Sequence, residues 1–270
     1  MESEVTDRRK DCPYWQQIQH ARTGGPSNPD KESEGKDLTY LGSKDKYLSW
    51  LLPLINSFRR GPDQLYIEPF MGSCAVLSNI EGKRAGSDVM ADLVELWKSL
   101  RDGSFTEPSH ITKAEYDAAM SPDFNGGVPS ATRAYMGFFW SFSGMFDKGY
   151  SPDFYRNSRS FYVACQRAKK LAGCALIPGP YSIYTPDKFR DCVIYCDPPY
   201  AGTTGYRGTP PFDQAAFYDW CQRMAAAGNT ILVSEYDLPS PFKLVGETMA
   251  DTSMATSKRQ GPRPERLYTL

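Results

Sequence analysis

The segment Val193-Ile194-Tyr195-Cys196-Asp197-Pro198-Pro199-Tyr200 joins a short apolar run to an acid, two prolines and an aromatic residue. The apolar run predicts a buried β-strand. The strand must end at the prolines, because proline cannot donate to a sheet ladder and disfavours helical backbone in the residue before it. We therefore expect Asp197 at the carboxyl end of a strand, in a stiff loop. In an open α/β sheet, that is where ligands bind.

Such a loop suits chemistry at an exocyclic amine of a nucleobase, which is a poor nucleophile because its lone pair is delocalised into the ring. The Asp197 carboxylate and the Pro198 carbonyl can hold both amine hydrogens, so that the nitrogen lone pair points outward. Tyr200 offers a flat face on which an extruded base can stack. The alternative is a strand that simply ends in a turn, since Asp-Pro is a common turn opener.

A second acidic strand end precedes this one in the chain. Residues 64–68 predict a strand that runs into Glu68-Pro69-Phe70-Met71-Gly72-Ser73, followed by helix-like residues from about 74 to 80. Gly72 lets the backbone approach a ligand closely, and Phe70 can line the pocket. This order of strand, glycine turn and helix predicts a nucleotide-type site.

A third acid, Asp88, follows a predicted strand at 84–87 and precedes a predicted helix at about 89–100. An acid at this place grips ribose hydroxyls in dinucleotide-type folds, or it caps the following helix, and both roles can coexist. The chain lacks the G-x-G-x-x-G fingerprint at this site, which disfavours a nicotinamide cofactor.

The segment Tyr40-Leu41-Gly42-Ser43-Lys44 opens the ordered part of the chain. Ser43 is a candidate N-cap for a helix through about Phe58, in which Pro53 predicts a kink or break. A Gly-Ser-Lys loop at a helix start can bind an anion or carboxylate through backbone N–H groups and one ammonium.

The rest of the chain alternates helical and extended patterns. Helices are expected at about 112–120, 129–140 and 158–171, and again at 212–227. Strands are expected at 181–184, closed by Asp187, and at 230–234, and residues 243–248 and 266–270 predict an edge hairpin. The Gly/Thr-rich loop 201–208, which contains Arg207, can close over a substrate. The aromatic-rich run 135–146 is best interpreted as the core of a small helical subdomain.

The charge distribution is uneven although the net charge of the 270 residues is only -1. Residues 130–190 hold nine Lys or Arg against three Asp or Glu, so this stretch carries +6 and the remainder −7. A basic patch on an otherwise acidic protein is typical of a phosphate-contacting surface, with an ordinary solvated face as the alternative. The nucleic-acid contacts predicted from this pattern and the mobile loop are Arg156, Arg159, Arg167, Lys170 and Arg207.

Seven scattered cysteines, an odd number, indicate reduced thiols and a cytoplasmic protein. With two histidines and no second cysteine pair, no zinc site and no other metal is expected. No run approaches the ~20 apolar residues of a membrane span, so no membrane contact is expected. Residues 1–36 are polar and predict a flexible tail.

The motifs Y-L-G-S-K, E-P-F-M-G-S, S-D, D-P-P-Y and V-S-E-Y-D, in this order, resemble the Dam-type (alpha-group) DNA adenine-N6 methyltransferases. The resemblance runs from about residue 38 to the C-terminus, where Pro-Glu-Arg-Leu-Tyr is similar to the family's last strand. Acids along one sheet edge also suit a cationic cofactor, and S-adenosyl-L-methionine is cationic at its sulfonium and its ammonium.

The resemblance implies an α/β fold: a Rossmann-like S-adenosylmethionine-dependent methyltransferase sheet with an inserted helical target-recognition domain. Residues 37–101 and 175–270 would form the catalytic domain, and residues 102–174 the insertion. The implied catalytic residues are Asp197, Pro198 and Tyr200. The implied cofactor-binding residues are Tyr40, Lys44, Glu68, Phe70, Gly72, Asp88, Asp187 and Asp197.

The implied activity is methyl transfer to the N6 amine of an adenine flipped out of double-stranded DNA. A second hypothesis keeps the cofactor and changes the acceptor to cytosine N4, an RNA adenine or a protein amide. A third is a catalytically idle DNA-binding relative. The aspartate and the motif order favour adenine, and the basic stretch favours nucleic acid over protein.

Overall fold

The computed structural model describes residues 43–124, 126–152, 154–200, 212–249 and 264–270. Tyr40, Arg207, the loop 201–208 and the predicted tail 1–36 lie outside the described residues. Their predicted roles remain predictions.

The described residues form a seven-stranded sheet in the order β3-β2-β1-β4-β5-β7-β6. Strands β1 to β5 run parallel, and β7 is antiparallel to both of its neighbours. The strands are β1 (Tyr66–Glu68), β2 (Arg84–Asp88), β3 (Ala175–Pro178), β4 (Val193–Cys196), β5 (Thr230–Ser234), β6 (Lys243–Thr248) and β7 (Glu265–Thr269). This topology confirms the predicted α/β, Rossmann-like fold.

The strand order reverses between β1 and β4, which lie side by side although about 125 residues separate them in the chain. Ligands of open α/β sheets bind outside the carboxyl ends of the strands at such a reversal. Glu68 ends β1 and Asp197 directly follows β4, so two predicted site segments meet at this point.

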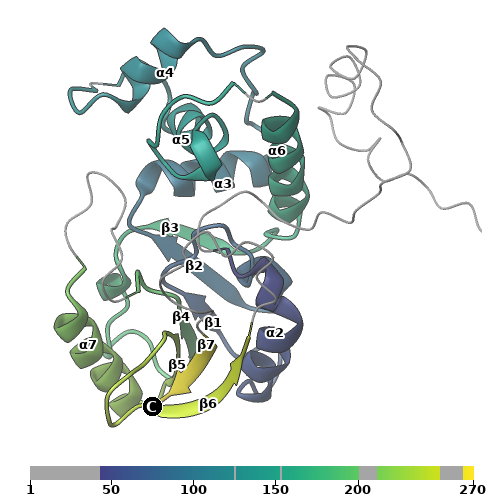
Figure 1. Ribbon diagram of the computed structural model, residues 1–270. Coiled ribbons are helices and arrows are strands. Elements are labelled where there is room, and N and C mark those ends of the chain that lie inside the picture. The colour runs from purple at the N-terminus through teal and green to yellow at the C-terminus, as the bar shows by residue number, and fades with distance from the viewer. Residues whose placement is uncertain (1–42, 125, 153, 201–211, 250–263) are drawn as a thin grey trace, which may run out of the picture.

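Side chains of the central strands alternate between two buried clusters, as the period of two in a β-strand requires. Tyr66 and Tyr195 enter one cluster, whereas Ile67 and Ile194 enter the other. Helices α2 (Leu48–Ser57) and α3 (Ala91–Asp102) bury their apolar faces in the first cluster, and α7 (Gln214–Ala226) covers the second. Figure 1 shows α2 and α7 on opposite sides of the sheet.

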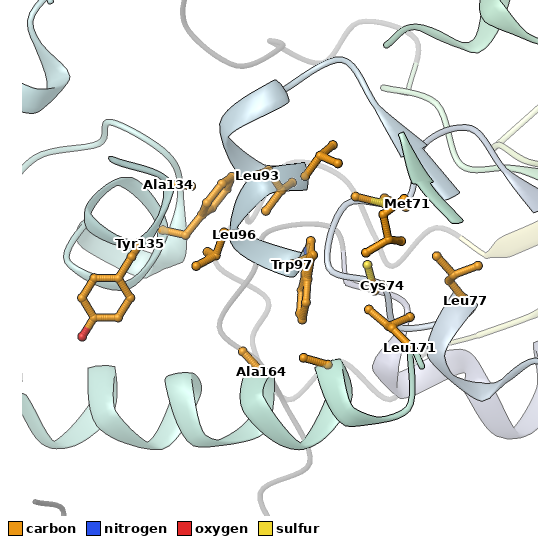
Figure 2. Packing of buried hydrophobic residues seen from close by; sticks show 14 of the residues in the cluster. Met71, Cys74, Leu77, Leu93, Leu96, Trp97, Ala134, Tyr135, Ala164 and Leu171 are labelled. Atoms are coloured by element: carbon orange, nitrogen blue, oxygen red, sulfur yellow. The ribbon is translucent and has the colours of Figure 1, made fainter. Parts of the chain in front are cut away.

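Three further helices, α4 (Lys113–Met120), α5 (Ser130–Phe139) and α6 (Phe154–Lys169), gather around α3 at the β3 end of the sheet (Figure 1). Their apolar residues belong to the same buried cluster as α2 and α3. Trp97 on α3 lies between α6 and the loop that carries Cys74 (Figure 2). The aromatic-rich run is largely core, as predicted: Tyr135, Phe138, Phe139 and Trp140 are all buried.

Four short 3-10 helices complete the described elements: η3 (Asp45–Tyr47), η4 (Leu77–Asn79), η5 (Phe142–Gly144) and η6 (Tyr181–Ile183). The predicted strand at 181–184 is wrong, because this segment forms η6, and the strand of this region is the preceding β3. The short β3 ends in a proline at the sheet edge, so it gives little periodic signal. Asp187 therefore follows no strand.

Other boundaries also differ from the predictions. The helix expected from Ser43 begins as η3 and then continues as α2 through Pro53 without a break. Residues 74–80 form only the single turn η4. Strands β6 and β7 pair as the predicted hairpin, but β7 inserts between β5 and β6, so of these two strands only β6 lies at a sheet edge.

Gly86 in β2 is a test of how tightly the glycine-loop segment packs on the sheet. A Cβ at this position would lie 2.4 Å from Leu77 Cδ2 and 3.1 Å from Met71 Sδ. We expect Gly86→Ala to lower the free energy of unfolding by about 1–3 kcal/mol through overpacking, measured by urea denaturation. Gly127→Ala is the control, because nothing lies within 4 Å of its added Cβ. Equal stability of the two variants would contradict the packing.

Candidate active site

Four side chains from distant segments meet where β4 ends: Lys44, Asp197, Tyr200 and Glu265, here called the Asp197 corner. The Lys44 ammonium lies 2.9 Å from Asp197 Oδ1 and 3.2 Å from Glu265 Oε1. It also donates to the Tyr200 hydroxyl at 2.6 Å. Lys44 and Glu265 are almost fully enclosed, with side chains 8% and 4% exposed, while Asp197 keeps 18%. Asp197 is thus the carboxylate of this corner with the greater access to solvent.

The charges in the Asp197 corner shift one another's pKa values. Burial raises the pKa of Asp197, the Lys44 ammonium lowers it and the Glu265 charge raises it again, which leaves a value of about 6. Burial alone would lower the pKa of Lys44, but the carboxylates of Asp197 and Glu265 outweigh that effect and raise it. Lys44 is therefore charged at neutral pH, and Asp197 titrates about one pH unit below neutral.

Tyr200 is held at both its hydroxyl and its ring. The hydroxyl donates to Glu265 at 2.8 Å from Oε1 and 3.0 Å from Oε2. The ring of Tyr236 meets the Tyr200 ring edge to face, with centroids 4.6 Å apart. Burial, together with the charges of Asp197 and Glu265, raises the pKa of Tyr200 far above its ordinary value, so it stays neutral.

The glycine turn after β1 is fixed from several sides. The Gly72 N–H donates to Asp88 Oδ2 at 3.1 Å, and the Gly72 carbonyl accepts from the Trp97 indole at 2.9 Å. Gly72 has a φ of 40°, in the left-handed region that glycine adopts without strain. Asp88 also accepts from the Met90 N–H at 2.9 Å. Burial raises the pKa of Asp88, and these two N–H donors oppose the rise.

Arg167 on α6 ties this turn to the segment that carries Lys44. Its guanidinium donates to the Ser73 carbonyl at 2.8 Å and forms a buried ion pair with Asp45. The Ser43 hydroxyl donates to Asp45 Oδ2 at 2.6 Å and lies 3.1 Å from the Ser73 hydroxyl. This closed network, Ser43–Asp45–Arg167–Ser73, is here called the loop clamp.

Arg167 was predicted from the charge pattern as a nucleic-acid contact, and the structure places it inside the protein instead. Its side chain is 8% exposed, and that of Asp45 is 7% exposed. A phosphate cannot reach a guanidinium that is enclosed in this way. Arg167 is therefore part of the loop clamp and not of an exposed surface that could contact DNA.

Glu68 and Phe70, both predicted at the cofactor site, lie in different surroundings. Glu68 is buried and accepts from the Tyr66 hydroxyl at 3.0 Å, and burial raises its pKa well above the ordinary value. Phe70 stacks on Tyr181 with centroids 5.7 Å apart and meets Phe212 edge to face. Glu68 thus holds the strand end from within, and Phe70 joins an aromatic cluster.

The remaining predicted residues are spread over the surface. Asp187 is exposed in the loop between η6 and β4. Arg159 on α6 is exposed, and Lys170 donates to Asn79 at 3.0 Å. Arg156 lies within α6, and its side chain is outside the described part of the structure. The basic stretch therefore divides into exposed and internal positions.

Two residues of this region had no role in the sequence-based prediction. Glu265 begins β7 and completes the Asp197 corner, although it follows Asp197 by 68 residues. Val89, directly after Asp88 at the end of β2, is 54% exposed. The sequence signal for Glu265 was an acid at the start of the strand pattern Glu265–Thr269.

No group of three or more His, Cys, Asp or Glu suited to a metal ion occurs among the described residues. Within the same part of the chain, no helix is long and apolar enough to cross a membrane.

The reversal point, the acids at the strand ends and the fixed glycine turn are features of a ligand-binding edge in a Rossmann-like sheet. Residues 40–124, about a third of the chain, match the family model of the D12 class N6 adenine-specific DNA methyltransferases. This match confirms the resemblance to the Dam-type adenine methyltransferases.

A comparison with curated proteins finds no match. Among solved structures, the chain is similar to "Putative methyltransferase yhhF" from Escherichia coli (12% identity, 87% of this chain and 88% of that chain, TM-score 0.38). It is also similar to the rRNA methyltransferase aviRa from Streptomyces viridochromogenes (14%, 98% and 92%, TM-score 0.37). A third is the precorrin-6y C5,15-methyltransferase from Geobacter metallireducens GS-15 (11%, 81% and 84%, TM-score 0.32). At these TM-scores the likeness says nothing about substrate.

Proposed function

We propose that the protein transfers a methyl group from S-adenosyl-L-methionine to the N6 amine of an adenine flipped out of double-stranded DNA. The observation that carries this proposal is Asp197, a partly accessible carboxylate at the sheet reversal, next to Tyr200. The match of residues 40–124 to an adenine-specific DNA methyltransferase model supports both the acceptor and the nucleic acid.

Asp197 and Pro198 orient the acceptor amine in this mechanism. Lys44 contacts Asp197 through Oδ1. The proposal assigns Oδ2 to one amine hydrogen and the Pro198 carbonyl to the other. Bound S-adenosyl-L-methionine supplies the electrophilic methyl group. The amine so oriented would take this methyl group as its bond to the cofactor sulfur breaks. The proton that the nitrogen then loses can pass to Asp197, whose pKa of about 6 suits a transient acceptor.

The residues at the carboxyl edge fit the proposed cofactor. A cation is favoured next to the carboxylates of Asp88 and Asp197, and the left-handed turn at Gly72 keeps side-chain bulk away from the ligand. The Asp88 carboxylate retains lone pairs beyond the two used by Gly72 and Met90, so it can also accept from ribose hydroxyls. The exposed Val89 offers an apolar face to a purine ring.

We further propose that residues 102–174 form a target-recognition insertion that docks DNA. Helices α4 to α6 lie outside the sheet, and Arg159, Lys169 and Lys148 are exposed on this part of the chain. Such residues would contact DNA phosphates. Substituting them with neutral residues would weaken binding to all DNA sequences alike and would reduce the salt dependence of binding.

The pH dependence follows from Asp197. A protonated carboxyl group cannot accept from the amine or take its proton, so the rate should fall below pH 6, the approximate pKa of Asp197, by about tenfold per pH unit. Single-turnover transfer of labelled methyl between pH 4.5 and 8, with cofactor binding measured at each pH, checks this. A rate that stays flat through pH 6 would refute the role.

One experiment tests the proposed function as a whole. The purified protein is incubated with labelled S-adenosyl-L-methionine and with duplex DNA or RNA, and the nucleosides are separated by mass spectrometry. N6-methyl-2′-deoxyadenosine from DNA, with no product from RNA, supports the proposal. N4-methyl-2′-deoxycytidine, or product from RNA alone, would show that the acceptor is a different one. No product, together with no calorimetric binding of S-adenosyl-L-methionine, would favour an idle DNA-binding relative.

A further inference from the structure

Glu265 stands out among the buried acids because it touches two members of the Asp197 corner from a separate part of the fold. It is the first residue of β7, its side chain is 4% exposed, and it contacts Tyr200 and Lys44. A buried carboxylate is costly unless it is paired and hydrogen-bonded. Both of its oxygens are used here, and both partners belong to the site rather than to the body of the sheet.

The hydrogen-bond directions in this group are determined by the chemistry of its members. A carboxylate only accepts, so the single proton of the Tyr200 hydroxyl points to Glu265. The hydroxyl lone pair is then directed to Lys44, which donates at 2.6 Å. The three N–H groups of Lys44 match its three acceptors: Asp197, Tyr200 and Glu265. Loss of the Glu265 charge weakens both the contact with the Lys44 ammonium and the hydrogen bond that the Tyr200 hydroxyl donates.

This arrangement leaves the Tyr200 ring little freedom. Its hydroxyl is anchored to Glu265, and Tyr236 packs against the ring edge to face. An aromatic platform that is held before the ligand arrives binds with less loss of side-chain entropy. Glu265 also shares the Lys44 ammonium with Asp197. This sharing weakens the interaction between Lys44 and the Asp197 carboxylate, which is the proposed acceptor of one amine hydrogen.

We propose that Glu265 is a positioning residue of the active site, which orients the Tyr200 ring and draws Lys44 away from Asp197. The C-terminal strand β7 then contributes to the site and does not only complete the sheet. This inference rests on the proposed function, because the group being positioned is the one proposed to receive the base.

The test is Glu265→Gln, which keeps the shape and one acceptor oxygen but removes the charge. We expect kcat to fall about tenfold, with cofactor affinity within about twofold of wild type. The acid limb of the pH–rate profile should move to lower pH. A neighbouring negative charge that raises the Asp197 pKa is lost, and Lys44 then pairs more strongly with Asp197. The charged groups that shift the Asp197 pKa are Lys44, Glu265 and Glu235. The Asp197 charge in turn acts on Tyr47, Glu68, Tyr195, Cys196 and Tyr200.

Two further variants separate positioning from stability. Tyr200→Phe removes only the hydroxyl. If Glu265 acts largely through Tyr200, the loss of kcat in the Glu265→Gln/Tyr200→Phe double variant should be smaller than the product of the fold-losses in the two single variants. Glu247→Gln is the matched control on the neighbouring β6, because its carboxylate pairs with Arg266 on the surface and is 53% exposed. This control should leave kcat and the pH profile unchanged.

The outcomes distinguish this inference from the proposed function. An active wild-type enzyme whose E265Q variant keeps the wild-type kcat and acid limb overturns the role of Glu265. A wild-type protein that methylates no acceptor overturns the proposed function. In that case a crystal structure of E265Q decides the inference: a displaced Tyr200 ring supports it, and an unchanged ring overturns it.

Discussion

Replacing Asp197 by alanine is expected to lower kcat for methyl transfer by about 10²–10⁴-fold, while cofactor binding is partly retained. The carboxylate is the acceptor that directs the amine lone pair, and no other acid of the corner has comparable access, since the Glu265 side chain is only 4% exposed. Lys44 keeps Glu265 and Tyr200 as partners in this variant, so the fold should persist.

The measurement is single-turnover methylation at saturating cofactor, together with calorimetric binding of S-adenosyl-L-methionine. Asp63→Ala is the control, because Asp63 is 94% exposed and pairs only with the surface residue Lys83. Asp197→Asn adds a second test, since it keeps the shape and removes the charge. An Asp197→Ala protein that transfers methyl groups at the wild-type rate would remove the basis of the proposed mechanism.

Replacing Arg167 by methionine is expected to lower the free energy of unfolding by about 3–5 kcal/mol, because it leaves the buried Asp45 carboxylate without its partner. The same change frees the Ser73 carbonyl, so the glycine turn loses one of its anchors. Cofactor affinity should therefore fall as well. Denaturant unfolding and calorimetry measure the two effects separately.

Two variants control for unrelated effects of this substitution. Lys169→Met removes an exposed cation from the end of the same helix and should change stability by less than about 0.5 kcal/mol. Combining Arg167→Met with Asp45→Asn removes both charges and should recover part of the lost stability, because no unpaired buried charge remains. An Arg167→Met protein as stable as wild type would show that the loop clamp contributes nothing.

The loop clamp also links the helical part of the chain to the proposed cofactor edge. Arg167 lies on α6, and its two contacts, Asp45 and Ser73, flank Lys44 and Gly72. A shift of α6 on binding DNA would thus act on the glycine turn directly. Helices α2, α3, α5 and α6 share one buried hydrophobic cluster, which supports such coupling.

The sequence by itself determined the central strands and the acids that end them. An apolar run followed by prolines or a glycine turn is a local signal, so β1, β2 and β4 and the positions of Glu68, Asp88 and Asp197 were predicted correctly. Backbone restriction by proline and the period of two both act within a few residues, so they need no knowledge of the partner strands.

Only the tertiary structure decided which charges meet. Lys44 contacts Tyr200 from 156 positions away and Arg167 contacts Asp45 from 122, and neither separation leaves a periodic trace in the sequence. The same holds for Glu265, which reaches Tyr200 because β7 inserts next to β5 in the antiparallel direction and places its first residue at the carboxyl edge of the parallel strands. A charge pattern reports how many ions a segment carries, but burial and partner choice depend on the packing of elements that are distant in the chain.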